Sequence, residues 1–332
     1  MTEIADSTAA LADVQARPPA LALSLSRVGV TGVEKVIRMR TADGEQLFHA
    51  RFECVIELGS DQKGAHMSRF EEVVNESIGE VVLGGAAFRV EKLAEQIARL
   101  VRERQNARRA EVTVEARFPE HKPAPVSGVR TQEIYTLHGV ALASERGTRR
   151  VTGVTAQGMT ACPCAQELIA AGATRNLSEL GFDADEITRI LEAVPVATHN
   201  QRGLGTLHIG CPEDCAVEID AQALLRIVEQ SMSSEIYELM KRSDEAHVVE
   251  KAHRRPRFVE DCVREMVRGV VDRFPELGAD VFVSARQVNL ETIHQHNVVA
   301  ERFGTLGEIR GELAGEPPAN HTSLQAWLGA AV

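Results

Sequence analysis

Aromatic residues and cysteines are scarce in this sequence. One Trp, two Tyr and ten Phe make up 4% of the chain, so a core built from its 44% hydrophobic residues must consist mainly of Val, Leu, Ile and Ala. Six cysteines in 332 residues are too few for a disulfide scaffold. No stretch approaches the roughly 20 apolar residues that a membrane-spanning helix requires. These shortages argue against a disulfide-stabilised fold and a helical membrane protein.

Basic residues are also outnumbered, with 37 Lys and Arg against 48 Asp and Glu, and the net charge is −11. A general nucleic-acid binder needs a basic surface, so this balance argues against that class, although a nucleotide site needs only a few local basic residues. Residues 1–19 lack the basic start and apolar run of a signal peptide, and no Gly-x-Gly-x-x-Gly motif is present. We therefore expect a cytoplasmic protein with reduced cysteines.

The first half of the chain has the element order β-β-α-α-β-β. Alternating apolar residues predict strands, and apolar residues at helical spacing predict helices, with Ser68 as a cap of the first helix. A Pro-rich stretch, 118–125, is interpreted as a loop. The predicted strands cover 21–39, 47–58, 111–118 and 132–143, and the predicted helices start at Ser68 and span 90–108.

The second half repeats this order, with a helical insertion at 165–194. Its predicted strands cover 149–159, 203–209 and 281–288, and its helices cover 220–232 and 256–270. The length suits two domains or a tandem repeat. We therefore expect an α+β chain with a disordered leader at 1–20, a first unit at 21–145, a second unit at 146–310 that carries most of the site, and a C-terminal tail at 311–332.

The most distinctive motif is Cys162-Pro163-Cys164, between a predicted strand and a predicted helix. Thiolates are soft ligands for zinc and iron(II), and the proline stiffens the backbone that presents them. With His199 and Glu235 from distant segments, Cys162 completes a thiolate, imidazole and carboxylate set typical of a catalytic metal site. Two cysteines one residue apart rarely bind one metal together, so we expect one ligand, preferably Cys162. The alternatives are a pair of buried core thiols, a surface or structural histidine at position 199, and a solvated helical glutamate at position 235.

Two further patterns indicate acid–base chemistry and purine recognition. If the segment is helical, Glu291 and His294 share a face, so that the carboxylate could orient the imidazole. The alternative is a polar loop after the last strand. Glu250 could bind the N–H edge of a guanine or pterin ring, although a solvated helical glutamate has the same sequence pattern. Basic residues that could contact a phosphate, or simply lie on the surface, are Lys63, His66, Arg69 and Arg202.

Six of these segments together resemble the type IB GTP cyclohydrolases. The resemblance extends from about Leu21 to Phe303 in the same order, and the helical insertion before His199 resembles the archaeal branch that serves methanopterin synthesis. The sequence departs from the common bacterial pattern at Ala165-Gln166 and in this insertion. The matching segments are 63–69, 160–164, 199–202, 233–245, 249–253 and 291–294.

The resemblance implies a tandem tunnelling fold, with two β-β-α-α-β-β units per subunit and helices on one face of antiparallel sheets. It also implies a homotetramer with active sites between subunits, GTP as substrate and one divalent metal per subunit: iron(II), zinc or manganese. The implied reaction is hydrolytic opening of the guanine imidazole ring, with release of formate. The product is a 7,8-dihydroneopterin phosphate, as a triphosphate or a 2',3'-cyclic phosphate, for folate or methanopterin synthesis.

The same resemblance implies roles for individual residues. Cys162, His199 and Glu235 match the metal environment, and Glu250 matches the carboxylate that anchors the purine. Cys164, Glu291 and His294 match the catalytic groups, while Lys63, His66, Arg69 and Arg202 are candidate substrate contacts. Two alternatives are another tunnelling-fold pterin or deazapurine enzyme and a non-catalytic metal-binding protein with a closed site.

Overall fold

A computed structural model describes residues 14–41, 44–81, 89–318 and 321–329 of the chain. Its strands are β1 Leu25–Thr41, β2 Gly44–Leu58, β3 Ala110–Pro123, β4 Arg130–Ser144, β5 Gly147–Ala161, β6 Asn200–Cys211, β7 Ser234–Glu235, β8 Phe282–Leu290 and β9 Val298–Thr305. Its helices are α1 Met67–Val81, α2 Val90–Gln105, α3 Pro163–Glu179, α4 Ala184–Ala193, α5 Ala221–Ser231, α6 Arg242–Arg254, α7 Val259–Arg273, α8 Leu306–Leu313 and α9 Leu324–Gly329. None of these helices is both long and apolar enough to cross a membrane.

Within the described residues the strands form one antiparallel sheet in the order β1-β2-β3-β4-β5-β6-β8-β9, and the short β7 pairs with β5. The two predicted units meet at the β4–β5 hairpin, which pairs Ser144 with Gly147 and runs back to Thr136 opposite Thr155. The sheet therefore continues from one half of the chain into the other, and the element order matches the expected α+β fold.

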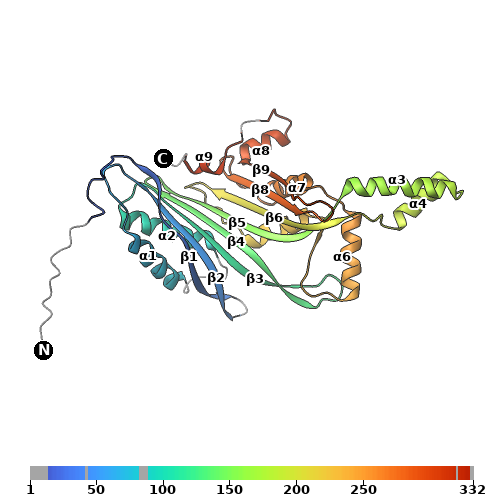
Figure 1. The fold of residues 1–332 in the computed structure, drawn as a ribbon, viewed down its shortest axis with the longest axis horizontal. Coiled ribbons are helices and arrows are strands. Elements are labelled where there is room, and N and C mark those ends of the chain that lie inside the picture. Colours follow the sequence, from blue (N-terminus) through green and yellow to red (C-terminus); the bar gives the residue numbers. More distant parts are fainter. Residues whose placement is uncertain (1–13, 42–43, 82–88, 319–320, 330–332) are drawn as a thin grey trace.

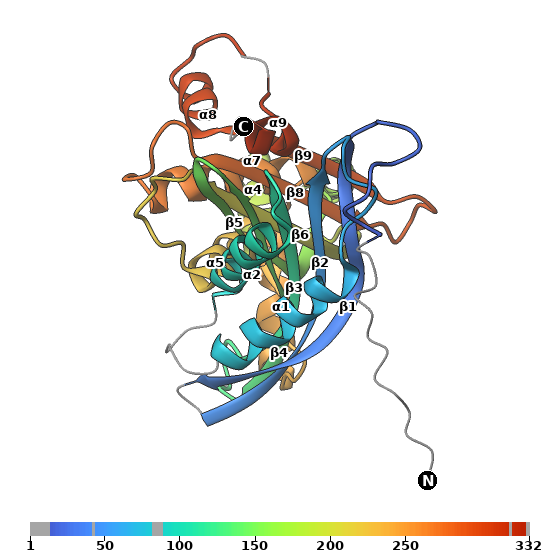
Figure 2. The same ribbon diagram turned by 90° about the vertical axis from the view of Figure 1, so that its left-hand side faces the viewer.

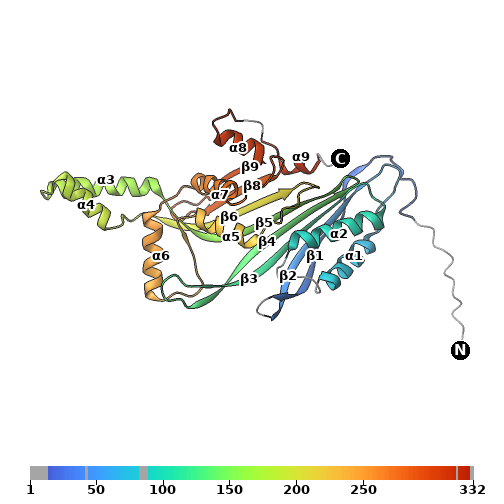
Figure 3. The same ribbon diagram turned by 180° about the vertical axis from the view of Figure 1, so that it is seen from behind.

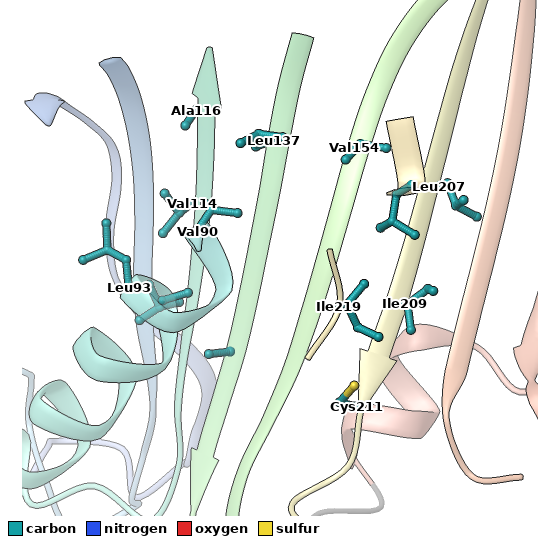
Figure 4. Close-up of a cluster of buried hydrophobic side chains, with 14 of the residues drawn as sticks. Val90, Leu93, Val114, Ala116, Leu137, Val154, Leu207, Ile209, Cys211 and Ile219 are labelled. Carbon is teal, nitrogen blue, oxygen red and sulfur yellow. The ribbon is translucent and has the colours of Figure 1, made fainter. Parts of the chain in front are cut away.

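One face of the sheet carries the main hydrophobic core. Side chains of α1, α2, α5 and α7 pack there against alternate residues of the strands. Figure 2 shows α1, α2 and α5 on the same side of the sheet. In Figure 4, Val90 and Leu93 of α2 lie over Val114 of β3, and Leu207 and Ile209 of β6 extend the same layer. As the composition predicts, this core is mainly aliphatic.

The C-terminal helix α9 covers the opposite face, so helices are not confined to one side. Trp327 packs on Phe282 of β8 with ring centroids 5.7 Å apart, beside Leu142 and Val151. The guanidinium of Arg149 lies 4.9 Å from the Trp327 ring, and the indole N–H donates to the carbonyl of Asp280 at 2.8 Å. This helix has six residues, too few for an apolar pattern in the sequence to predict it.

The predicted loop at 118–125 is wrong, because β3 continues through Pro123. Beyond Ala116, β3 no longer pairs with β2 and forms a two-stranded ribbon with β4. A proline lacks a backbone N–H, but on the open edge of such a ribbon no partner needs that donor. The prolines therefore mark an edge strand rather than a loop.

The tip of this ribbon is held by α6, a helix that the sequence analysis did not predict. The carboxylate of Asp244 accepts hydrogen bonds from the backbone N–H groups of Val126 and Ser127 and from the Ser127 hydroxyl. It also accepts one from the N–H of Lys241 at 2.8 Å. Although burial acts in the opposite direction, these donors lower the pKa of Asp244. The β3–β4 ribbon and α6 are thereby joined.

Element boundaries differ from prediction in two further places. Helix α1 begins at Met67, so Ser68 is its second residue and not its cap. Helix α2 ends at Gln105, because Asn106 adopts a left-handed conformation with φ 49° and closes the helix. Residues 1–13 of the expected disordered leader lie outside the described residues. Further on, the carbonyls of Gln15 and Arg17 accept hydrogen bonds from the backbone N–H of Lys63.

Glu91, in the first turn of α2, provides a test of core electrostatics. Its side chain is buried, and burial raises its pKa to about 7 despite nearby basic residues. Because the folded pKa exceeds the unfolded one, stability is full below pH 4.5 and falls as pH rises toward 7. We expect Glu91→Gln to raise the free energy of unfolding at pH 8 by up to about 3 kcal/mol. Urea unfolding at pH 4 and pH 8 measures the change in free energy, and Glu103→Gln, at an exposed position of the same helix, is the control. An equal gain in stability at both pH values would contradict the prediction.

Candidate active site

Cys162 lies at the junction of β5 and α3. It is the N-cap of α3, Pro163 occupies the first helical position, and the Cys162 sulfur accepts a hydrogen bond from the N–H of Ala165 at 3.5 Å. Cys162 is half-buried, whereas Cys164 is exposed. Cys162 thus presents its sulfur at the positive end of a helix dipole, a suitable place for a metal ligand.

His199 lies directly beside Cys162. Strands β5 and β6 pair up to Ala161 opposite Asn200, so the residues that follow and precede these strands are neighbours. The N–H of Cys162 donates to the carbonyl of His199 at 3.1 Å, and the hydroxyl of Thr198 donates to the carbonyl of Cys162 at 2.8 Å. Antiparallel pairing therefore brings together two predicted ligands that are 37 positions apart.

The His199 ring has an unsatisfied nitrogen. Its Nδ1 atom is buried and has no hydrogen-bond partner among the described residues, and Oε2 of Glu291 lies 3.9 Å away. A buried, unpaired ring nitrogen beside a thiol fits a soft divalent metal, because imidazole and thiolate are ligands of zinc and iron(II). Cys162 and His199 therefore fit a metal site, and the carboxylate of Glu291 lies beside it.

Glu235, the third predicted ligand, has another partner. It lies on β7, opposite Gly158 of β5, and its carboxylate forms an ion pair with the ammonium group of Lys251 on α6. Burial alone would raise its pKa, but the hydrogen bond and charge of Lys251 hold the pKa below its usual value. Within the part of the chain that the structure describes, no three His, Cys, Asp or Glu side chains form a metal-binding group. Glu235 could therefore bind a metal only after leaving Lys251.

Glu291 and His294 lie on the bend between β8 and β9, not on a helix. The carboxylate of Glu291 is near His199, as described above, and His294 is exposed and stacks on His296 with centroids 5.1 Å apart. The hydroxyl of Thr292 donates to the carbonyl of Asn200 at 3.0 Å, which ties this bend to the start of β6. The bend therefore reaches the Cys162–His199 corner through Glu291.

Glu250 lies on the exposed side of α6. Its Oε1 atom accepts a hydrogen bond from Nε of Arg254, one turn later, at 2.8 Å. The other end of the Arg254 guanidinium donates to the carbonyls of Glu192 and Ala193, at the end of α4. The predicted purine-binding carboxylate is thus connected to the α3–α4 pair.

The predicted basic contacts fall into two places. Arg202 is exposed on β6, near the site. Lys63, His66 and Arg69 precede or begin α1, and Figure 1 shows α1 and α3 toward opposite ends of the long axis. The guanidinium of Arg69 donates to the carbonyl of Arg104 at 2.9 Å. Within one chain these three residues lie far from Cys162.

Three residues that hold the site were not predicted: Gln166, Lys251 and Arg254. Each follows a predicted site residue, and two of them do so by four positions, which is one turn of a helix. Gln166 follows Cys162 on α3, and Arg254 follows Glu250 on α6. A search for polar residues one helical turn after each candidate residue could therefore have found Gln166 and Arg254.

Comparisons with known proteins identify the family of this chain. A sequence model of the family described as type I GTP cyclohydrolase folE2 matches residues 11–300. The chain belongs to this family. It is 42% identical over 308 residues to "GTP cyclohydrolase MptA" of Methanococcus maripaludis (strain C5), covering 91% of this chain and 97% of that protein. It is 41% identical over 313 residues to the protein of the same name from Methanosarcina acetivorans, with the same coverage.

Membership of the type I GTP cyclohydrolases confirms the resemblance drawn from the six sequence segments, and both relatives come from methanogens, as the helical insertion suggested. Among solved structures, uricase from Arthrobacter globiformis aligns with a TM-score of 0.49 and 10% identity, covering 84% of this chain and 93% of the uricase.

Proposed function

We propose that this chain is a GTP cyclohydrolase that hydrolytically opens the imidazole ring of guanine, releases C8 as formate and forms a 7,8-dihydroneopterin phosphate for pterin synthesis. The observation that carries the proposal is the juxtaposition of Cys162 and His199 in a chain of the type I GTP cyclohydrolase family. A cytoplasmic location follows from the pathway chemistry, which uses a soluble nucleotide.

A divalent metal, iron(II), zinc or manganese, is part of this proposal. Cys162 and His199 would hold it, with Glu235 as third ligand after release from Lys251. A metal with an open position supplies a bound water of lowered pKa, and hence a nucleophile at neutral pH. Glu291 would lie beside this metal, because its carboxylate is 3.9 Å from the Nδ1 atom of His199.

The remaining residues would bind GTP and move protons. Glu250 would accept hydrogen bonds from the N–H groups of the guanine edge. His294 would donate a proton to the imidazole ring nitrogen of guanine as the bond from this nitrogen to C8 breaks. Cys164 would be a second thiol near the site. His294 is exposed on the β8–β9 bend. Arg202 would contact the phosphates.

We infer a homo-oligomer, in keeping with the implied tetramer, with active sites between subunits. Lys63, His66 and Arg69 are too far from Cys162 to serve the same site within one chain, so a neighbouring copy would supply them. The α3–α4 pair extends away from the sheet, and Leu168 and Leu180 on it are 70% and 75% exposed. Exposed leucines on an extension of this kind are typical of subunit contacts.

The test is anaerobic incubation of the metal-reconstituted protein with GTP, because air would oxidise both iron(II) and thiolates. We expect formate release together with a dihydropterin absorbance, and the mass of the product distinguishes a triphosphate from a cyclic phosphate. The metal-free protein is the control. Absence of both products with iron(II), zinc and manganese would contradict the proposal.

A further inference from the structure

The side-chain amide of Gln166 connects three segments of the site. Its Nε2 group donates to the carbonyl of Val196 at 2.8 Å and to the carbonyl of His253 at 2.6 Å. Both partners are backbone carbonyls, which can only accept, so the amide nitrogen and not the amide oxygen must face them. Gln166 therefore uses both of its side-chain N–H donors. A carboxylate oxygen in the same place could not form a hydrogen bond with either carbonyl.

Each connected segment carries a different site residue. Gln166 lies in the first turn of α3, where its backbone N–H donates to the carbonyl of Cys162 at 3.3 Å. Val196 lies in the segment that leads from α4 to His199. His253 lies near the end of α6, three residues after Glu250. One amide thus links the segments of the thiol, the imidazole and the purine-binding carboxylate.

Neighbouring contacts join the same segments. The His253 Nε2 atom lies 3.3 Å from the carbonyl of Thr198, the residue before His199. Arg254 joins Glu250 to the last carbonyls of α4. Gln166, His253 and Arg254 line a cavity of about 410 Å³ at the root of the α3–α4 pair. In Figure 3 the base of α3 and one end of α6 lie side by side at this place.

We propose that Gln166 is a positioning residue of the reaction, holding Cys162, His199 and Glu250 at the separation that ring opening needs. This inference rests on the proposed function. Among the described residues the side chain of Gln166 bonds to the backbone carbonyls of Val196 and His253, so its effect passes through the segments that it joins. A displacement of about 1 Å in a catalytic group can lower a rate about 100-fold, so loss of this link affects turnover strongly.

The test measures turnover of GTP at pH 8 in variants of Gln166 that differ in the number of side-chain N–H donors. Gln166→Leu and Gln166→Glu have similar size but no N–H donor, whereas Gln166→Lys has three donors on a flexible stem. We expect kcat to fall at least about 10-fold in the first two variants and to stay within about 3-fold of wild type in Gln166→Lys. Gln222→Leu, at an exposed position of α5, is the matched control and should keep full activity.

The outcomes separate this inference from the proposed function. A wild-type protein without turnover would contradict the proposed function. An active wild type with Gln166→Leu and Gln166→Glu both within about 2-fold of it would contradict only the positioning role. Equal losses in all three variants would show that shape, not hydrogen bonding, matters at this position, and would also overturn the inference. If Gln166→Leu fails to fold by circular dichroism, the comparison of Gln166→Glu with Gln166→Lys decides.

Discussion

Replacing Cys162 with serine is expected to lower formate release from GTP more than about 100-fold and to remove most of the bound metal. A hydroxyl is a hard, neutral donor and a poor substitute for a thiolate toward zinc or iron(II). Even outer-sphere partners of a metal ligand change metal affinity or activity by about 10–100-fold, so a ligand itself should matter more. Formate release and metal per subunit, by atomic emission, measure the two effects.

Two matched variants locate this effect. Cys164→Ser tests the exposed thiol two residues away, and we expect it to keep the metal even if turnover falls. Cys215→Ser tests a thiol whose sulfur faces the carbonyl of Val217, away from the site, and should change neither metal content nor turnover. A Cys162→Ser protein that retains both metal and activity, or a Cys164→Ser protein that loses the metal, would reverse the assignment of the two thiols.

Cys162 and His199 were predicted to share a metal site from the chemistry of their side chains and from the family resemblance, and both adjoin predicted strands. Once β5 and β6 pair, their ends must be neighbours. Glu235 was harder to place, because it lies on a two-residue strand whose ion pair with Lys251 depends on tertiary packing. The Glu291–His294 pairing assumed a helix, and the bend at this place sends the two side chains to different partners.

Helix α6 and strand β9 were among the elements missed for lack of an apolar pattern. Helix α6 buries only Asp244, Val248 and Ala252, and one of these is a carboxylate that holds the ribbon tip. Strand β9 is at the edge of the sheet, and most of its residues are exposed or half-buried. Edge strands and helices held by polar contacts bury too few apolar residues for periodicity to reveal them. The well-predicted helix α2, in contrast, buries nine residues.

Replacing Glu250 with glutamine is expected to lower kcat/KM for GTP about 100-fold. A carboxylate presents two acceptors to the two N–H groups of the guanine edge, whereas an amide replaces one acceptor with a donor that faces a donor. A bidentate contact of this kind favours the matching base over another by about 1–3 kcal/mol. A site in which a donor faces a donor weakens binding further, because buried polar groups are left unpaired. Steady-state kinetics with GTP and with ITP, which lacks the exocyclic amino group, measure the effect. The wild type should prefer GTP, and Glu250→Gln should lose this preference.

A loss of activity in Glu250→Gln could also come from loss of the ion pair between Glu250 and Arg254, and the same experiment tests this explanation. The two side chains are 55% and 43% exposed and one helical turn apart, and such pairs stabilise a helix by only about 0.3–0.5 kcal/mol. Loss of this pair should therefore leave the melting temperature nearly unchanged, while guanine recognition is lost. Glu245→Gln, an exposed position on the same helix, is the matched control. An equal loss of activity in Glu245→Gln, or an unchanged GTP-to-ITP ratio in Glu250→Gln, would show that Glu250 serves the helix and not the purine.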